Sequence, residues 1–208
     1  MSLTEKLTTA LAKQNIQVTD SQLNQLNAYL ELLSKWNQAY NLTAISSIEQ
    51  MIPYHILDSL SVLPFLHGKV CLDVGTGAGL PGIPLAIMQP ISQFYLLDSN
   101  GKKTRFLQQV KFELELDNIH IINSRIKAYQ PDIEFSTIVS RAFASLNDFV
   151  QATIHLQNAQ TVLLAMKGEK AAQEIKLLKA TNFDIGQNKV KIHGIDGERC
   201  ILSLKNPG

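Results

Sequence analysis

The chain has 208 residues, of which 45% are hydrophobic, enough to bury the core of one α/β domain with a short additional segment. Its formal net charge of +1 excludes the strongly basic composition that would by itself indicate a nucleic-acid partner. The sequence has no signal-peptide pattern, no apolar run of membrane-spanning length and no histidine or cysteine cluster at metal-ligand spacing. We therefore expect a cytoplasmic protein that holds no metal and does not associate with a membrane.

Residues 1–67 are predicted to form a helical extension packed on the domain that follows. After Thr19, leucines recur at three- and four-residue steps, as on one face of an amphipathic helix. Thr19 and Gln22 have the spacing of a capping box at the start of that helix. A second helical stretch is expected over residues 48–65. Its apolar positions are Met51, Ile52, Ile56, Leu60 and Leu63.

From residue 68 to residue 208, apolar strands alternate with helical segments, which predicts a doubly wound, mostly parallel sheet. The predicted strands in chain order are 69–74, 93–98, 118–123, 135–140 and 160–166. Helices are predicted between them and after them, over residues 82–89, 101–116, 145–157 and 169–181. Two further strands, joined by a turn rich in Gly and Asp, would complete seven strands as an antiparallel C-terminal hairpin, over residues 189–193 and 199–204.

The segment from Asp73 to Gly82 combines a strand end, a tight turn and a helix start, the arrangement that holds nucleotide-like cofactors in α/β proteins. Its pattern is D-x-G-x-G-x-G, whereas the dinucleotide fingerprint G-x-G-x-x-G would need glycine at Leu80. It resembles motif I of the class I S-adenosylmethionine-dependent methyltransferases, and the terminal hairpin also favours that fold over a nicotinamide-dependent enzyme. The predicted cofactor contacts in this segment are Asp73, Gly75, Gly77, Gly79 and Leu80.

Asp98 ends the next predicted strand, about twenty residues after the glycine turn. From that position its carboxylate can accept hydrogen bonds from both hydroxyls of a ribose. The alternative is that Asp98 only caps the helix starting near Gly101. We expect ribose binding, because the glycine turn and the acidic residue together indicate a cofactor site more specifically than either does alone.

Five motifs in this chain occur together and in a fixed order: residues 37–45, 55–59, 73–82, 140–143 and 196–199. On these motifs the chain resembles the RsmG (GidB) family of bacterial 16S ribosomal RNA methyltransferases along nearly its whole length. The resemblance implies methyl transfer from S-adenosylmethionine to N7 of a guanine in 16S ribosomal RNA, either free or in a small-subunit particle. It places cofactor contacts at Gly75, Leu80, Ile126, Lys127 and Arg141. Lys127 stands where the family commonly has an acidic residue. A contact between adenine and the backbone of residue 127 would not depend on which side chain stands there.

The residues near the predicted site agree with chemistry at a ring nitrogen. N7 of guanine has an in-plane lone pair at neutral pH, so its methylation needs alignment and desolvation but no general base. An Asn/Asp-Pro-Pro-aromatic turn, which serves exocyclic amines, is replaced here by the segment 140–143. Methylation at C5 of a pyrimidine would need a cysteine nucleophile. Cys71 and Cys200 lie in strand-like runs, where we expect buried, reduced thiols poorly placed for that role.

Several side chains near the site have two interpretations. Arg141 is expected to position the cofactor carboxylate or the RNA, but it could instead pair with Asp58 or Asp148. Phe143 could stack on the target base or pack in the core. His55 and Asp58 share a helical face and could bind the glycine turn or only pack their own helix.

The charges are distributed unevenly between the two parts of the chain. Residues 1–68 carry three lysines and five acidic residues, whereas residues 69–208 carry sixteen basic and thirteen acidic residues. This mildly basic second part is compatible with RNA, which needs an open, basic entrance, whereas a small-molecule methyltransferase, the alternative function, would favour a closed lid. The candidate phosphate contacts, which could equally form a solvated face, are Lys102, Lys103, Arg105 and Arg199. We expect a monomer.

Overall fold

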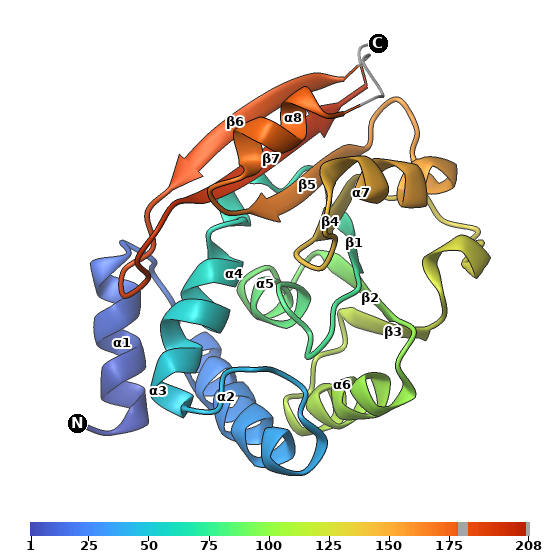
Figure 1. Ribbon diagram of the computed structural model, residues 1–208. Helices are drawn as coiled ribbons and strands as arrows, with labels where there is room; N and C mark the ends of the chain where they lie inside the picture. The colour runs from blue at the N-terminus through green and yellow to red at the C-terminus, as the bar shows by residue number, and fades with distance from the viewer. Residues whose placement is uncertain (179–182, 207–208) are drawn as a thin grey trace.

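The computed structural model describes residues 1–178 and 183–206. Its centre is a seven-stranded sheet with strand order β3-β2-β1-β4-β5-β7-β6 (Figure 1). The five parallel strands are β1 (Val70–Val74), β2 (Gln93–Asp98), β3 (Ile119–Asn123), β4 (Thr137–Ser140) and β5 (Val162–Lys167). Two antiparallel strands follow, β6 (Asp184–Val190) and β7 (Arg199–Lys205). The predicted class I methyltransferase topology, a mostly parallel sheet with a C-terminal hairpin, is confirmed.

Successive residues of the central strands alternate between two hydrophobic cores, as the period of an extended chain requires. Leu96 packs on one side of the sheet and Leu97 on the other, and Val139 and Ile138 divide in the same way. The first core is covered by α5 (Gly82–Met88) and α6 (Gly101–Glu113). The second core is covered by α7 (Leu146–Thr153), the 3₁₀ turn η4 (Ile154–Leu156) and α8 (Ala171–Lys176). A further 3₁₀ turn, η3 (Ile126–Ala128), follows β3.

The N-terminal helices join the first core. They are α1 (Leu3–Lys13), α2 (Asp20–Tyr40), α3 (Ile48–Met51), the π-helical turn η1 (Ile52–Leu57), α4 (Asp58–Leu60) and the 3₁₀ turn η2 (Leu63–Phe65). The capping box of α2 is confirmed, since Gln22 N donates to Thr19 Oγ1 at 3.2 Å and Thr19 N donates to Gln22 Oε1 at 2.9 Å. Because these helices bury their leucines against α5 and α6, they pack as an extension of the core. The boundary at residue 68 stays a prediction.

Three predicted elements differ from the structure, and one helix was not predicted. The single helix expected over residues 48–65 is broken into four short elements, with a π-helical turn that begins just before Pro53. Helix α1 was not predicted, although Ser2 and Glu5 form a capping box at its start. The first strand of the hairpin spans 184–190 rather than 189–193, because this polar edge strand lacks the apolar alternation of a buried one. The predicted helix 169–181 is shorter in the structure, where it spans Ala171–Lys176, and residues 179–181 lie outside the described residues.

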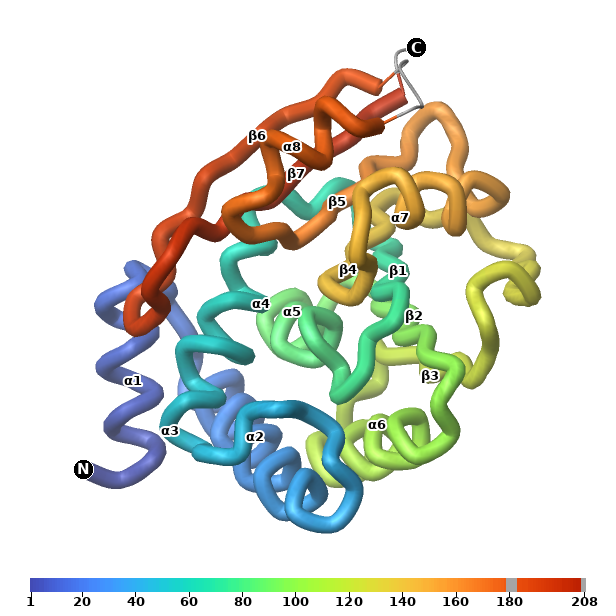
Figure 2. The backbone as a smooth tube through the Cα atoms, in the orientation of Figure 1, coloured from blue at the N-terminus to red at the C-terminus, as the bar shows by residue number. Residues whose placement is uncertain are grey.

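The turn between β6 and β7 reaches back to α1, as Figure 2 shows. Gln14 Nε2 donates to the carbonyl of Lys191 at 2.8 Å, and His193 N donates to Gln14 Oε1 at 2.9 Å. These two hydrogen bonds connect the C-terminal hairpin to the N-terminal helix α1. Cys71 and Cys200 are buried and free, as predicted. Within residues 1–178 and 183–206, no helix is long and apolar enough to span a membrane.

Candidate active site

The glycine turn after β1 is fixed from below by the carboxylate of Asp73. Asp73 Oδ2 accepts hydrogen bonds from Thr76 Oγ1 at 2.6 Å and from Gly82 N at 2.8 Å. Asp73 is 1% exposed, and burial raises its pKa to about 6 although both hydrogen bonds oppose this. The structure therefore places Asp73 beneath the turn, where it holds the turn in shape. A direct contact with a cofactor stays a prediction.

Gly77 and Gly79 have different surroundings in the same turn. Gly77 has φ +63°, and a Cβ there would meet nothing closer than Lys103 Nζ at 3.8 Å. A Cβ at Gly79 would collide with the side chain of Ile83 and lie 2.9 Å from Leu107 Cδ2. The glycine at position 77 thus keeps a left-handed backbone beside open space, whereas the glycine at position 79 allows the turn to pack on its helix.

Asp98 connects the end of β2 to the glycine turn. Its Oδ2 accepts from Gly77 N at 2.9 Å, its Oδ1 accepts from Asn100 N at 2.8 Å, and Lys103 Nζ lies 3.6 Å from Oδ2. The cap of α6 is Asn100, whose Oδ1 accepts from Lys102 N at 2.9 Å. The interpretation of Asp98 as only the helix cap is therefore wrong.

A cavity of about 470 Å³ opens at the carboxyl ends of β1 and β2, where ligands of such sheets bind. Four of the predicted cofactor residues line it: Gly75, Asp98, Ile126 and Lys127. A smaller adjacent cavity of about 250 Å³ shares Gly75 with the first and is lined by three more of the predicted cofactor residues: Gly77, Leu80 and Arg141. Asp73 and Gly79 support this region without lining either of the two cavities. The predicted cofactor residues thus come together around one continuous edge of the sheet.

The residues predicted to contact RNA do not lie together in the structure. Lys102 and Arg105 are exposed on α6, whereas Lys103 lines the cavity of Asp98. Arg199 lines a different cavity, on the far side of Arg141, so the four cations do not form one rim. Phe143 packs in the core, because its ring lies 5.3 Å from that of Phe149, and it also lines the cavity of Asp98; stacking on the target base stays a prediction.

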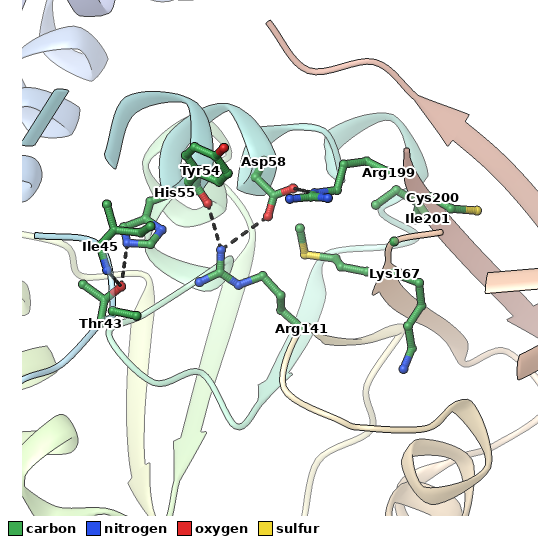
Figure 3. A pocket seen from close by; sticks show the side chains of 13 residues that line it. Thr43, Ile45, Tyr54, His55, Asp58, Arg141, Lys167, Arg199, Cys200 and Ile201 are labelled. Carbon is green, nitrogen blue, oxygen red and sulfur yellow. Dashed lines mark hydrogen bonds and ion pairs between the residues drawn. The ribbon is translucent and has the colours of Figure 1, made fainter. Parts of the chain in front are cut away.

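Arg141 and Arg199 approach Asp58 from two sides (Figure 3). Arg141 Nη1 lies 3.3 Å from Asp58 Oδ2 and donates to the carbonyl of Tyr54 at 3.1 Å, and Arg199 Nε lies 3.3 Å from Asp58 Oδ1. Burial raises the pKa of Asp58, and the two guanidinium groups oppose this. Of the alternatives for Arg141, the pairing with Asp58 is present and the pairing with Asp148 is not among the ion pairs of the described residues.

His55 belongs to the same group of side chains. It is 3% exposed, and its Nε2 lies 2.9 Å from Thr43 Oγ1. Burial lowers its pKa to about 4, with a further lowering from Arg141, so the ring is neutral at pH 7. Neither His55 nor Asp58 forms a hydrogen bond with the glycine turn among the described residues. Instead they connect η1 to Thr43 and to the two arginines.

Sequence reasoning missed two supports of the site. The buried hydroxyl of Tyr29 donates to the carbonyl of Ala78 at 2.8 Å, from α2 into the glycine turn. Lys167 Nζ donates to the carbonyl of Phe143 at 2.9 Å and lies 2.8 Å from Glu174 Oε2, which fixes the segment after β4. Their chain separations leave no local pattern by which either pair could be found.

The chain is similar to known proteins of one family. Residues 22–202 match the family model described as "GidB: rRNA small subunit methyltransferase G". The chain is 47% identical over 201 residues to the ribosomal RNA small subunit methyltransferase G of Pseudomonas syringae pv. tomato, covering 97% of this chain and 95% of that protein. It is 45% identical over 205 residues to the protein of the same description from Psychromonas ingrahamii, covering 99% of each.

Among solved structures, the fold is similar to magnesium protoporphyrin IX methyltransferase (ChlM) from Synechocystis PCC 6803 with bound S-adenosylmethionine. The TM-score is 0.61 at 17% identity, over 92% of this chain and 99% of that one. At this identity the likeness shows the fold alone. The family match and the curated relatives, in contrast, extend over nearly the whole chain, and they confirm the resemblance drawn from the sequence motifs. The chain belongs to the GidB family, rRNA small subunit methyltransferase G.

Proposed function

We propose that this protein transfers a methyl group from S-adenosylmethionine to N7 of a guanine in 16S ribosomal RNA. The observation that carries the proposal is the family membership, which extends over residues 22–202 and includes the glycine turn, Asp98 and Arg141. The proposal includes action in the cytoplasm, as a monomer, on RNA that is either free or part of a small-subunit particle. No observation on the described residues favours the small-molecule alternative.

The residues around the cavity of about 470 Å³ fit S-adenosylmethionine. A carboxylate has about four acceptor positions, and Asp98 uses one on each oxygen for a backbone N–H. Each oxygen therefore keeps an acceptor position for one of the two ribose hydroxyls. The apolar Ile126 and the backbone of Lys127 would contact the adenine, and Gly77 would allow the close approach of the chain. Bound there, the cofactor would supply an electrophilic methyl group on its sulfonium.

The protein's part in the reaction would be alignment rather than proton transfer. N7 carries no proton, and the titratable groups near the site suit this requirement. His55 is neutral and hydrogen-bonded to Thr43, and Asp58 is engaged by two arginines. Burial raises the pKa of both Cys71 and Cys200, which disfavours a thiolate nucleophile. Arg141, which lies beside the glycine turn, would position the donor and the acceptor.

The test is incubation of the protein with labelled S-adenosylmethionine and either 16S RNA or small-subunit particles, followed by mapping of the methylated atom. We expect one N7-methylguanine, and a single-turnover rate that is flat between about pH 6 and 9 because no base has to titrate. The Cys71→Ala/Cys200→Ala double variant should keep turnover, whereas Arg141→Ala should lower the rate at saturating RNA. Methylation at another atom, or a rate that falls steeply below pH 7 in the wild type and becomes flat on substitution of His55, would reject the proposal.

A further inference from the structure

A second cavity of about 380 Å³ is lined by Arg141, Asp58 and Arg199 (Figure 3) and shares no lining residue with the cofactor cavity. Its walls come from the segment 43–45, from η1 and α4, and from the ends of β5 and β7. The small cavity of about 250 Å³ borders both, because it shares Thr43 and Arg141 with this one and Gly75 with the cofactor cavity. A group held in the second cavity would therefore lie next to the proposed methyl donor.

We propose that this second cavity receives the target guanine, turned out of the RNA, and that Arg141 and Arg199 bind it in an arrangement fixed by Asp58. The inference rests on the proposed function and adds the place and the recognition of the acceptor base. The cavity volume falls within the range of about 300–1,000 Å³ typical of small-ligand sites. An enzyme that acts on an atom of a stacked base commonly extrudes that base into such a pocket.

The donors in the cavity match the acceptors of guanine. Arginine is the usual partner of guanine O6 and N7, which it often binds together with two N–H groups. Methylation at N7 requires a different arrangement, in which an N–H group binds O6 and the lone pair of N7 stays free to attack the methyl group. Nη1 of Arg141 is already engaged by the Tyr54 carbonyl and Asp58, so the pair of terminal nitrogens is not free to bind both atoms. The remaining donors of Arg141 can bind O6 while N7 faces the methyl group.

Asp58 acts as the positioning residue. Its side chain is 9% exposed, and each oxygen has one arginine as its partner at 3.3 Å. A carboxylate between two guanidinium groups holds both in fixed positions and leaves the group with a net positive charge, which suits a nucleotide with its phosphate. Arg199, on β7, stands at the outer side of this group and is half-buried, which suits contact with the backbone of the flipped nucleotide.

His55 also lines this cavity and helps to fix its wall, because its Nε2 lies 2.9 Å from Thr43 Oγ1. Its Nδ1 is closed off from solvent, so this nitrogen adds no contact for the nucleotide.

The test fills each cavity separately with a large side chain. Ala44 is exposed and lines only the second cavity, whereas Ser99 is exposed and lines only the cofactor cavity. We expect Ala44→Phe to lower kcat/KM for RNA by about tenfold or more with S-adenosylmethionine affinity unchanged, and Ser99→Phe to weaken the cofactor instead. Ser46→Phe is the matched control, because it adds the same bulk to an exposed residue two positions away, outside the cavity.

The outcomes separate this inference from the proposed function. If the wild type methylates guanine N7 but Ala44→Phe has the kinetics of Ser46→Phe, or if Ala44→Phe weakens the cofactor, the second cavity does not hold the base. If the wild type methylates no guanine, the proposed function fails first. Photocrosslinking the wild type to an RNA with 6-thioguanine at the mapped position gives an answer without any variant. Crosslinks within residues 43–45, 54–58, 166–168 or 199–201, or to Arg141, support the inference, and crosslinks confined to other segments overturn it.

Discussion

The hydroxyl of Tyr29 donates a 2.8 Å hydrogen bond to the backbone carbonyl of Ala78, and this bond joins the N-terminal helices to the glycine turn. Tyr29 is fully buried, and its ring lies 6.4 Å from that of Phe106 on α6. The bond therefore forms inside the core, where an unpaired carbonyl would be costly. The long helix α2 thus stabilises the shape of the turn that we assign to the cofactor.

Replacing Tyr29 by Phe keeps the ring but leaves the Ala78 carbonyl without this donor. We expect the free energy of unfolding to fall by about 1–3 kcal/mol, the cost of an unsatisfied buried acceptor, and S-adenosylmethionine to bind more weakly. Chemical denaturation and calorimetry measure the two effects. Tyr40→Phe is the control, because Tyr40 is 47% exposed and its loss of a hydroxyl should change stability by less than about 0.5 kcal/mol. Equal effects of the two substitutions would contradict the role given to Tyr29.

Two glycines of the turn should respond differently to substitution. Gly77→Val should abolish S-adenosylmethionine binding, because a β-branched residue resists φ +63° and would extend toward the cofactor. A Cβ at Gly82 would collide with the Leu96 side chain and lie 2.8 Å from Asp73 Oδ2. Gly82→Ala should therefore act mainly on the fold and lower the free energy of unfolding by about 1–3 kcal/mol. Unchanged cofactor affinity in a folded Gly77→Val variant would remove the turn from the cofactor site.

Asp98 and Asn100 separate cofactor binding from helix capping. Asp98→Ala should weaken S-adenosylmethionine by about 1.5–3 kcal/mol, since it removes the acceptor of the ribose hydroxyls. Asn100→Ala removes the cap of α6 and should cost about 1 kcal/mol of stability with unchanged cofactor affinity. Isothermal calorimetry on both folded variants measures the difference. The assignment fails if the Asp98 variant binds the cofactor as tightly as the Asn100 variant does.

His55 should make the protein less stable in acid. Its pKa is about 4 in the folded protein and 6.5 when unperturbed, so the unfolded chain binds the proton more tightly. The stability it contributes is present above pH 6.5 and is lost as the pH falls toward 4, by up to about 3 kcal/mol. Asp73 opposes this, because its pKa is raised from 3.8 to about 6 and its unfavourable contribution disappears over a similar range.

His55→Gln removes the first of these two contributions and leaves the second. We expect the variant to gain stability relative to the wild type as the pH falls from 7 toward 4, measured by chemical denaturation at each pH. His193→Gln, at an exposed histidine, is the control. A difference between His55→Gln and the wild type that does not change with pH would show that His55 is not buried in its neutral form.

The exposed cations Lys102 and Arg105 allow a test of RNA binding on α6. Neither forms an ion pair in the part of the chain that the structure describes, whereas Lys103 lies near Asp98 and Arg199 pairs with Asp58. In Lys102→Ala/Arg105→Ala, the dependence of log K for RNA on log salt should become shallower by about 0.7–0.9 for each phosphate that is no longer neutralised. Cofactor affinity should not change. Lys13→Ala/Lys35→Ala removes two exposed lysines from the N-terminal helices and is the matched control. Identical salt slopes for the two double variants would place the RNA on another surface.

The parallel strands could be predicted because each is a short apolar run that ends in a turn, and the glycine pattern located the cofactor side of the sheet. The π-helical turn η1 could not be predicted in this way. The apolar residues around it fit an α-helical period, and no local sequence pattern indicates a π-helical turn. As a partner of Arg141, Asp58 was predicted only as one of two alternatives. Asp58 and Arg141 are 83 positions apart in the sequence, and only the folded sheet brings Arg199 to the same carboxylate.

The π-helical turn η1 makes the number of residues in this segment critical for the site. It carries the Tyr54 carbonyl and leads directly to Asp58, and both contact Nη1 of Arg141. Deleting one residue from η1 would restore an ordinary helix but turn the flanking parts by about 100° relative to each other. Asp58 and the segment before η1 could not then both keep their places beside the arginine. The number of residues in this stretch is thus a constraint of its own, separate from the packing of its buried side chains.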